Sequence, residues 1–388
     1  MSSRHANWIA GALALVVSST SAFGLDVADK QAAEHATSRG IAFFRQTQND
    51  NGSWSPDPGP AVTALIVTAM LEQPHIEEDD LAVYKALGYI LARRHTDGSI
   101  HDGFLPNYNT AICLSALSMV PARPGVADAV RKAQGYLRGL QWAGQPDGHG
   151  RRVDVSHPFY GGAGYGRHGR PDLSNTQIML QGLHDSGLSC DDPAYQRALV
   201  FISRCQGSAS NHMFGKEIAG DGGFIYSTSV DRNLIGIPQS MANPESIGEA
   251  KAGRAVSGLR TYGSMTYAGF KSYIYIALDR RDPRVVDAHH WIRNHYTLDQ
   301  NPGLPEYIKM QGYYYYLMTF ARALRAWGPD TLTTADGRER HWPSDLIAKL
   351  VLLQRPDGSW TNEADRWLEG DPHLVTAYAL IALNHAKR

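Results

Sequence analysis

Two kinds of helical segment alternate along the chain. Segments of the first kind place Lys and Arg on one side and apolar residues on the other, as at Lys85, Arg131 and Arg197. Segments of the second kind carry almost no charge until their ends. An amphipathic pattern predicts a helix with one solvent-facing side, and an uninterrupted apolar pattern predicts a helix that is buried nearly all round. The chain is therefore expected to fold as pairs of one outer and one inner helix.

The pattern repeats six times, and we call each repeat a unit. In each unit a large residue stands five positions before the residue that ends the first segment, and in five of the six it is aromatic: Phe43 with Gln48, Tyr89 with Arg94, Tyr136 with Gln141, Phe201 with Gln206, Trp291 with Tyr296, and Lys349 with Gln354. A glycine turn follows in each unit, at Gly52, Gly98, Gly148, Gly222, Gly303 and Gly358. Glycine suits such turns because it takes positive φ without steric cost.

The second segment of most units contains a threonine six residues before a small residue: Thr63, Thr110, Thr176 and Thr376. In the fourth unit the same count back from Ala277 leads to Lys271, and the fifth unit has the run Tyr313 to Tyr316 instead. We expect six helix pairs, each burying its apolar face against its neighbours.

Two concentric rings of six helices satisfy both kinds of segment, so the sequence predicts an all-α fold, an α6/α6 barrel. An open solenoid of helix pairs is the alternative. The expected domain organisation is a signal peptide at 1–24 and a single barrel domain at 25–388 with insertions at 143–172 and 207–262. Both insertions join a first helix to its second helix, so they are expected to form a mouth over the central cavity.

Residues 1–24 read as a secretory signal, with Arg4 and His5, an apolar run from Trp8 to Val17, and small residues near Ala22. An uncleaved membrane anchor is the alternative, but ten apolar residues fall short of the ~20 that span a bilayer. The mature protein is expected to be secreted or periplasmic. A net charge of −1 over 388 residues, without blocks of like charge, indicates no nucleic-acid partner and no membrane-surface patch.

The first unit, Arg39 to Trp54, resembles residue for residue the Gln-Trp repeat of squalene-hopene and oxidosqualene cyclases. The chain is therefore similar to the terpenoid cyclase and protein prenyltransferase α/α-toroid superfamily. It especially resembles exported bacterial proteins with prenyltransferase and squalene-oxidase repeats, in the stretches 169–176 and 262–269. This resemblance implies a toroid fold and a largely apolar, isoprenoid type of ligand in the central cavity. One fold hosts many activities, so it implies less about chemistry.

The segments that resemble the catalytic motif of hopene-type cyclases lack its acid. Those enzymes use an Asp-x-Asp-Asp-Thr-Ala segment, and the nearest segments here are Pro106 to Ala111 and Asp172 to Gln177. The central aspartate is replaced by Tyr108 or Ser174. A phenol with a pKa of about 10 is too weak to protonate an alkene. Conventional class II cyclisation is not expected.

The zinc ligands of protein prenyltransferases, an Asp, a Cys and a His, are also incomplete. The resembling segments are 261–264 and 371–376, which supply a hydroxyl in place of the cysteine and a shifted His373. A zinc site of this kind needs the thiolate. We expect no metal and no cofactor.

Three residues are candidates for catalysis, each with a structural alternative. Asp172 precedes an inner helix, where it is either the N-cap of that helix or a carboxylate at the cavity mouth. Asp221 precedes two glycines, where it is either a turn residue or a second carboxylate that pairs with Asp172. Lys271 lies where the inner ring should be apolar, so it requires a partner, for which Asp172, Asp221 or Asp371 is available. A structural ion pair and an anion-binding or catalytic lysine are both open.

Further candidates lie near the starts of inner helices. His373, beside Asp371, is a candidate general base or a capping residue. Candidate ligand-binding residues are Asn175, Tyr226, Tyr267, Tyr314 and Tyr378.

Three functions remain open from the sequence. The first is an exported toroid that binds or transforms an apolar ligand. The second is a non-catalytic binding or scaffold protein with a side-chain-filled cavity. The third is a carbohydrate-active α/α barrel, which requires two facing carboxylates roughly 5–9.5 Å apart, with Asp172 and Asp221 as the tempting pair.

Overall fold

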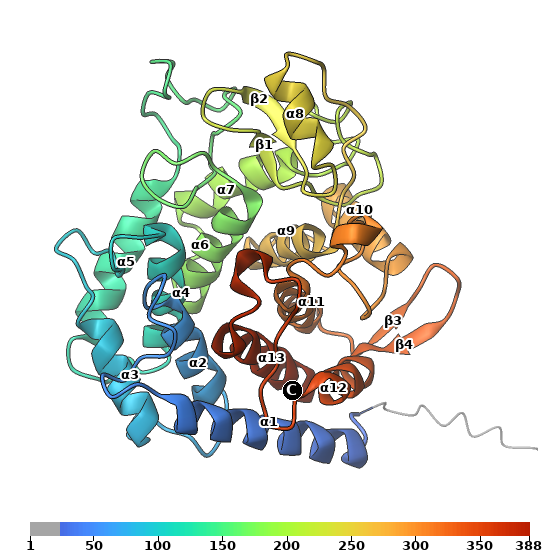
Figure 1. Cartoon of the computed structure of the whole chain (residues 1–388). Helices are drawn as coiled ribbons and strands as arrows, with labels where there is room; N and C mark the ends of the chain where they lie inside the picture. Colours follow the sequence, from blue (N-terminus) through green and yellow to red (C-terminus); the bar gives the residue numbers. More distant parts are fainter. Residues whose placement is uncertain (1–23) are drawn as a thin grey trace, which may run out of the picture.

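The computed structural model describes residues 24–388, which form two concentric rings of helices (Figure 1). The signal peptide predicted at 1–24 lies almost wholly outside the described residues and stays a prediction. The outer ring contains α1 (Val27–Thr47), α3 (Leu81–Leu91), α5 (Val126–Leu140), α7 (Pro193–Arg204), α10 (Pro283–Asn294) and α12 (Trp342–Leu353). The inner ring contains α2 (Ala61–Leu71), α4 (Pro106–Ser118), α6 (Leu173–Asp185), α9 (Gly263–Tyr275), α11 (Tyr313–Trp327) and α13 (Pro372–Lys387).

The inner ring closes on itself. Each inner helix packs against the next in the order α2, α4, α6, α9, α11 and α13, and α13 packs against α2 again. In the outer ring α1 contacts α12, so the first and last units are neighbours. The predicted α6/α6 barrel is confirmed, and the open solenoid is wrong.

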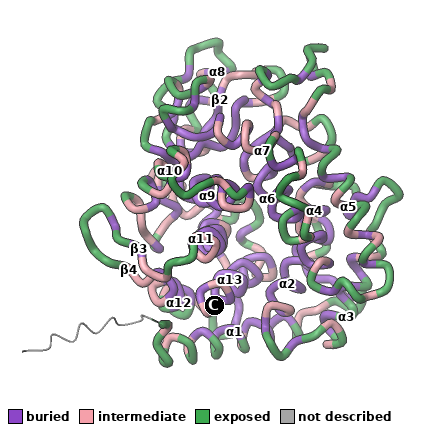
Figure 2. The backbone as a smooth tube through the Cα atoms, turned by 180° about the vertical axis from the view of Figure 1, so that it is seen from behind, coloured by how far each residue is buried: buried purple, intermediate pink, exposed green. Residues whose placement is uncertain are grey.

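Burial follows the two patterns seen in the sequence (Figure 2). Every residue of α2 from Ala61 to Met70 is buried, whereas α5 buries one stripe and exposes the rest. Inner helices are enclosed by the outer ring on one side and by the side chains of the lumen on the other. No helix of the described part is long and apolar enough to cross a membrane.

A glutamine joins neighbouring units in the same way four times around the barrel. Gln48 Nε2 donates to the carbonyl of Gly52 in its own turn (3.1 Å) and to that of Ala82 in the next outer helix (2.8 Å). We call this pair of bonds the glutamine clamp. The other clamps are Gln141 to Gly161 and Ala194 (3.0 and 2.8 Å), Gln206 to Gly222 and Arg284 (3.0 and 2.8 Å), and Gln354 to Gly358 and Ala36 (2.9 and 2.9 Å).

The turn of the third unit differs from the prediction. Gln141 pairs with Gly161, not with the predicted Gly148, because the insertion of this unit precedes its turn. Gly161 has a φ of +82° and packs against the Arg197 carbonyl, while a Cβ on Gly148 would meet nothing.

The threonines of the inner helices bind the turns. Thr63 Oγ1 accepts from Trp54 N (3.0 Å), and Thr110, Thr176 and Thr376 accept in the same way from their own turns. In the fourth unit this residue is Thr266, which accepts from Phe224 N (3.1 Å). Lys271 was therefore the wrong equivalent, because the small residue that follows the threonine here is Ser272.

The segments that interrupt the repeat carry the remaining elements. Residues 205–262 contain β1 (Ser227–Ser229), β2 (Ile235–Gln239) and α8 (Glu245–Lys251), with β1 antiparallel to β2. The hairpin β3 (Thr331–Thr333) and β4 (Glu339–His341) joins α11 to α12, and short 3-10 helices occupy Glu306–Ile308 and Arg366–Leu368. Every connection from an outer to an inner helix lies at one end of the barrel, which we call the mouth.

The turn glycines are expected to matter because they touch the next outer helix. Gly358 and Gly337 both have positive φ, +90° and +80°, but only at Gly358 would a Cβ meet a neighbour, the Arg39 carbonyl at 2.5 Å. Gly337→Ala should lower the free energy of unfolding by about 1 kcal/mol, the cost of the left-handed backbone. Gly358→Ala should lower it by about 2–4 kcal/mol because α1 must also shift. Urea unfolding of both variants measures this, and equal losses would contradict the packing role of the turn.

Candidate functional site

The lumen is lined by three levels of side chains from the inner helices. Most side chains that line its cavity stand two or five residues after each threonine, or after Tyr313 in α11. Tyr108, Ala111 and Gln177 complete this lining, and of the positions nine residues on only Arg322 belongs to it. The cavity that remains measures about 30 Å³. A water needs about 10–15 Å³, so the lumen is filled mainly by protein.

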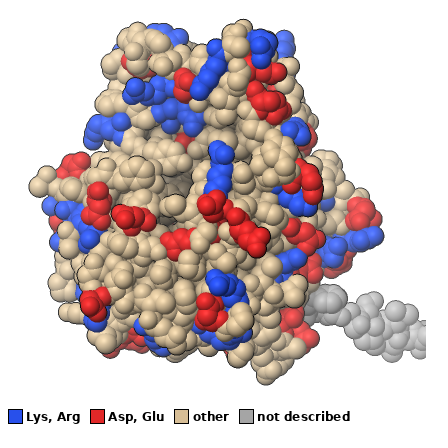
Figure 3. Space-filling model, viewed as in Figure 1, with Lys and Arg blue, Asp and Glu red and all other residues tan. Residues whose placement is uncertain are grey.

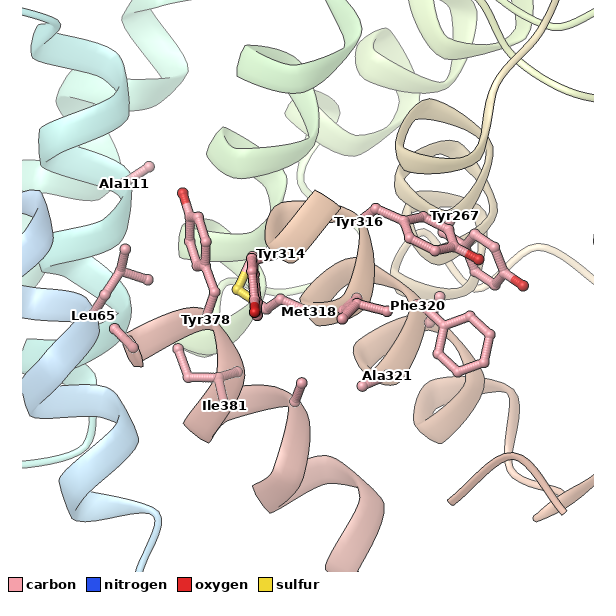
Figure 4. Packing of buried hydrophobic residues seen from close by; sticks show 14 of the residues in the cluster. Leu65, Ala111, Tyr267, Tyr314, Tyr316, Met318, Phe320, Ala321, Tyr378 and Ile381 are labelled. Atoms are coloured by element: carbon pink, nitrogen blue, oxygen red, sulfur yellow. The ribbon is translucent and has the colours of Figure 1, made fainter. Parts of the chain in front are cut away.

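Tyrosines close the lumen toward the mouth. Tyr108 and Tyr378 join their hydroxyls at 3.0 Å, and Tyr315 accepts from Gln177 Nε2 at 2.8 Å. Tyr378 lies between Leu65 and Ala111 on one side and α11 on the other (Figure 4). Burial raises the pKa of Tyr108 to about 12. The residue in place of the cyclase acid is thus a weaker acid than a free phenol.

Lys271 lies at the middle level, with Thr68, Ser115, Gln181 and Met318. Its ammonium donates to Gln181 Oε1 at 2.6 Å. The predicted partners Asp172, Asp221 and Asp371 were wrong, and the carboxylate whose charge acts on the ammonium is Asp185. Burial, and next the charge of Arg322, hold the pKa of Lys271 well below its usual value.

Below this level the lumen ends in a set of ionisable side chains that we call the floor: Glu72, Asp185, Tyr275, Arg322 and His385. Glu72 accepts from Asn384 Nδ2 at 3.0 Å and pairs with Arg388 at 3.2 Å. Burial raises the pKa of Glu72 and lowers that of His385. The sequence analysis missed the floor. Four of its members stand nine residues after Thr63, Thr176, Thr266 and Thr376, and this shared spacing is the signal in the sequence that could have identified it.

Asp172, Asn175 and Tyr226 come together at the mouth. Asp172 Oδ1 accepts from Asn175 N at 2.8 Å and from Ser174 Oγ at 2.9 Å, which makes it the N-cap of α6. Its Oδ2 accepts from Asn175 Nδ2 at 2.9 Å. Burial raises the pKa of Asp172, and its charge in turn raises that of Tyr226, whose own burial is the larger cause. The carboxylate primarily stabilises the start of the helix.

Asp221 occupies a different environment. It is exposed, and it accepts from Gly223 N at 3.1 Å and from Thr261 Oγ1 at 2.8 Å. Asn51, Asp97 and Asp357 accept from the residue two positions on in the same way. Asp221 is therefore a turn residue of the repeat, while Asp172 is fully buried in a helix cap.

The remaining candidates contribute mainly to packing. His373 bonds Ser55 Oγ through Nδ1 (2.8 Å) and Thr47 Oγ1 through Nε2 (3.0 Å), between the first and last units. Tyr267 packs edge-on against Tyr316, and its hydroxyl is buried without a partner in the described part of the chain. Tyr314 is buried at the start of α11.

Glu369 is a buried carboxylate in the connection between α12 and α13. Its Oε1 accepts from Tyr315 N at 2.8 Å, and its Oε2 from Asn362 Nδ2 at 2.7 Å. The side chain thus binds the N-terminus of α11 from the loop before α13. Burial raises the pKa of Glu369 to about 7. Residues 24–388 hold no group of three metal-ligating side chains.

Comparisons with known proteins place the fold. No protein-family model and no curated protein sequence matches the chain. Type II terpene cyclase MstE from Scytonema is similar in structure, with a TM-score of 0.52 and 13% identity over 92% of this chain and 98% of the other. An inactive variant of an α-1,6-mannanase from Salegentibacter, in complex with α-1,6-mannotriose, gives 0.55 and 9% over 92% and 98%. A protein from Actinoplanes gives 0.51 and 13% over 92% and 100%.

These likenesses establish a class of fold. The chain is an α/α toroid of the kind found in terpene cyclases, and the same architecture is shared with family 76 glycoside hydrolases. At 9–13% identity they establish the fold alone.

The raised pKa of Glu369 predicts a pH dependence of stability. The native carboxyl retains its proton up to about pH 7, whereas an unperturbed glutamate has a pKa of 4.5. The native state therefore binds more protons than the unfolded state between these pH values, and stability falls as pH rises through them. Glu369→Gln lacks this loss, so from pH 5 to pH 8 it should gain about 1–3 kcal/mol relative to the unmodified chain. Urea unfolding at both pH values measures the gain, with exposed Glu363→Gln as the control. A constant difference would contradict the assignment.

Proposed function

We propose that the protein binds a largely apolar ligand of isoprenoid type, which enters through the mouth. The observation that carries this proposal is the placement of exposed aromatic residues. Among residues 24–388, four of the five exposed aromatic side chains lie on connections at the mouth, and only Tyr84 lies on the outer wall: Phe104 (58%), Tyr165 (39%), Tyr307 (75%) and Trp367 (41%).

Aromatic side chains at the rim of a hollow are typical of a site that receives an apolar molecule. Leu368, beside Trp367, is also half exposed. On the face seen in Figure 3, charged side chains are scattered between larger uncharged areas. Acidic side chains gather across the middle of this face and basic ones near its top, so no continuous basic surface of the kind that binds nucleic acid covers it.

Holding the ligand is better supported than class II cyclisation. The two positions that resemble the cyclase acid are Tyr108, with a pKa of about 12, and Ser174, which donates to Asp172. Neither provides a strong acid facing the lumen. The neighbour MstE has been solved with geranylgeranyl dihydroxybenzoate as substrate, at a TM-score of 0.50 and 12% identity. That ligand supports an isoprenoid as the first compound to test.

The carbohydrate-active alternative receives less support. It requires two carboxylates that face each other across a cleft. Asp172 is buried in a helix cap, and Asp221 is exposed in a turn. The likeness to the mannanase rests on fold, and one fold hosts many chemistries.

The volume of the lumen adds a requirement. A cavity of about 30 Å³ cannot hold a prenyl chain, so the ligand must displace the side chains of Tyr108, Tyr315 and Tyr378. Binding is therefore expected to change the environment of these phenols.

Farnesol should bind, and the rim should contribute to its affinity. The double variant Phe104→Ser with Trp367→Ser should weaken binding about tenfold, because burying part of two aromatic rings contributes about 1–2 kcal/mol. Titration calorimetry in detergent-free buffer measures the dissociation constant of farnesol for each variant. Leu352→Ser is the matched control, since Leu352 is 77% exposed on the outer helix α12.

Three outcomes are informative. Weakened binding in the rim variant alone supports the proposal. Equal weakening by Leu352→Ser indicates non-specific adsorption to exposed apolar residues. No farnesol binding by the unmodified chain, together with mannotriose binding, would favour the carbohydrate reading.

A further inference from the structure

The lower lumen contains two buried basic side chains that form no ion pair within the described residues. Arg322 is 9% exposed and lines the same cavity as Lys271, which is 2% exposed. The Nε of Arg322 is buried without a hydrogen-bond partner in the described part of the chain. The only hydrogen bond of the Lys271 ammonium within residues 24–388 goes to a neutral amide, Gln181 Oε1. A buried charge without a direct counter-charge is unfavourable.

The carboxylates of the floor already have other partners. Glu72 is held by Arg388 and Asn384. Asp185 Oδ1 accepts from Gln181 Nε2 at 2.6 Å, so Gln181 stands between this carboxylate and the Lys271 ammonium. Both carboxylates act on Arg322 through their charge, but neither forms an ion pair with it among the described residues. His385 is a neutral or positive group and cannot supply the missing negative charge. Burial lowers its pKa and so favours the neutral ring.

The cavity beside these cations has two chemically different ends. Lys271, Arg322 and Gln181 line one end, while Leu65, Ile112 and Ile178 line the other. Its volume of about 30 Å³ is room for about two oxygen-sized atoms. A planar carboxylate fits this space better than a tetrahedral phosphate, and a guanidinium binds a carboxylate with two parallel bonds.

We propose that the lower lumen binds the carboxylate group of an apolar acid between the Lys271 ammonium and the Arg322 guanidinium. This inference rests on the proposed function and adds the chemical class of the ligand: an isoprenoid acid with its chain directed toward the mouth. A bound carboxylate would raise the pKa of Lys271, which burial and the charge of Arg322 hold low in its absence.

The test compares an acid with the alcohol of the same chain. Farnesoic acid should bind the unmodified chain at least tenfold more tightly than farnesol at pH 7.5. In Arg322→Gln and in Lys271→Met this preference should fall to less than threefold, with farnesol affinity unchanged. Titration calorimetry measures the affinities for acid and alcohol in all three proteins.

The matched control is Arg325→Gln, on the same helix. Arg325 already pairs with Asp330 at 2.9 Å and donates to the carbonyl of His385. This variant should keep the preference for the acid.

Thermal unfolding without ligand separates binding from a structural role. If Arg322 serves to bind an anion, Arg322→Gln should keep or raise the melting temperature, because an uncompensated buried charge is removed. A fall of several degrees would show that Arg322 stabilises Glu72 and Asp185 instead, and would overturn the inference.

The two proposals fail in different ways. Equal binding of acid and alcohol overturns the carboxylate site and leaves the apolar-ligand proposal standing. If neither long-chain compound binds, the proposed function fails, and acetate then tests the site alone. An acetate-dependent rise in melting temperature that is absent in Arg322→Gln supports the site, and the absence of such a rise overturns it.

Discussion

The glutamine clamp is the interaction on which the barrel depends. Each clamp joins the turn of one unit to the outer helix of the next through two bonds from a single amide, as Gln48 does to Gly52 and Ala82. A side-chain amide has two N–H donors, so one residue can satisfy carbonyls in both units. Gln354 makes the same bonds to Gly358 and Ala36, and through them the sixth unit is joined to the first. A local turn motif thereby joins neighbouring units at four of the six positions around the ring.

Closing the ring determines what the lumen can be. Six inner helices that pack side by side leave a narrow axis, and large side chains such as Tyr108, Tyr315 and Tyr378 fill its upper part. Polar side chains in the lower part must satisfy one another, and most do through short chains of bonds such as Lys271, Gln181 and Asp185. The lumen is therefore a packed interior whose composition changes along the axis.

The repeating features could be predicted from the sequence, whereas the contacts between side chains of different inner helices could not. Helix pairs, turn glycines and the closed barrel follow from local periodicity, which is visible in each unit. The turn of the third unit was misplaced at Gly148, because an insertion separates Gln141 from Gly161. Lys271 was correctly identified as buried, but its partners were wrong. The residues around it, Gln181 and Arg322, belong to α6 and α11, the inner helices on either side of α9. Which of their side chains reach Lys271 depends on how the helices are aligned along the barrel axis, and the pattern within one unit does not give this alignment.

The arrangement of the lumen also gives it a direction. The mouth carries exposed aromatic residues, and the tyrosines below it are neutral phenols whose pKa is raised further by burial. Beyond them lie Lys271 and Arg322, which form no ion pair within residues 24–388. The side chains around Lys271 are almost fully buried, so an electrostatic interaction is stronger there than at the mouth. A molecule with an apolar chain and one anionic end would meet favourable contacts in only one orientation. The same burial disfavours a purely apolar molecule in the lower lumen, since the Arg322 guanidinium would then have no ion-pair partner. Selectivity for an acidic end would thus arise from burial and from the lack of a carboxylate partner, without any strong acid or metal in the lumen.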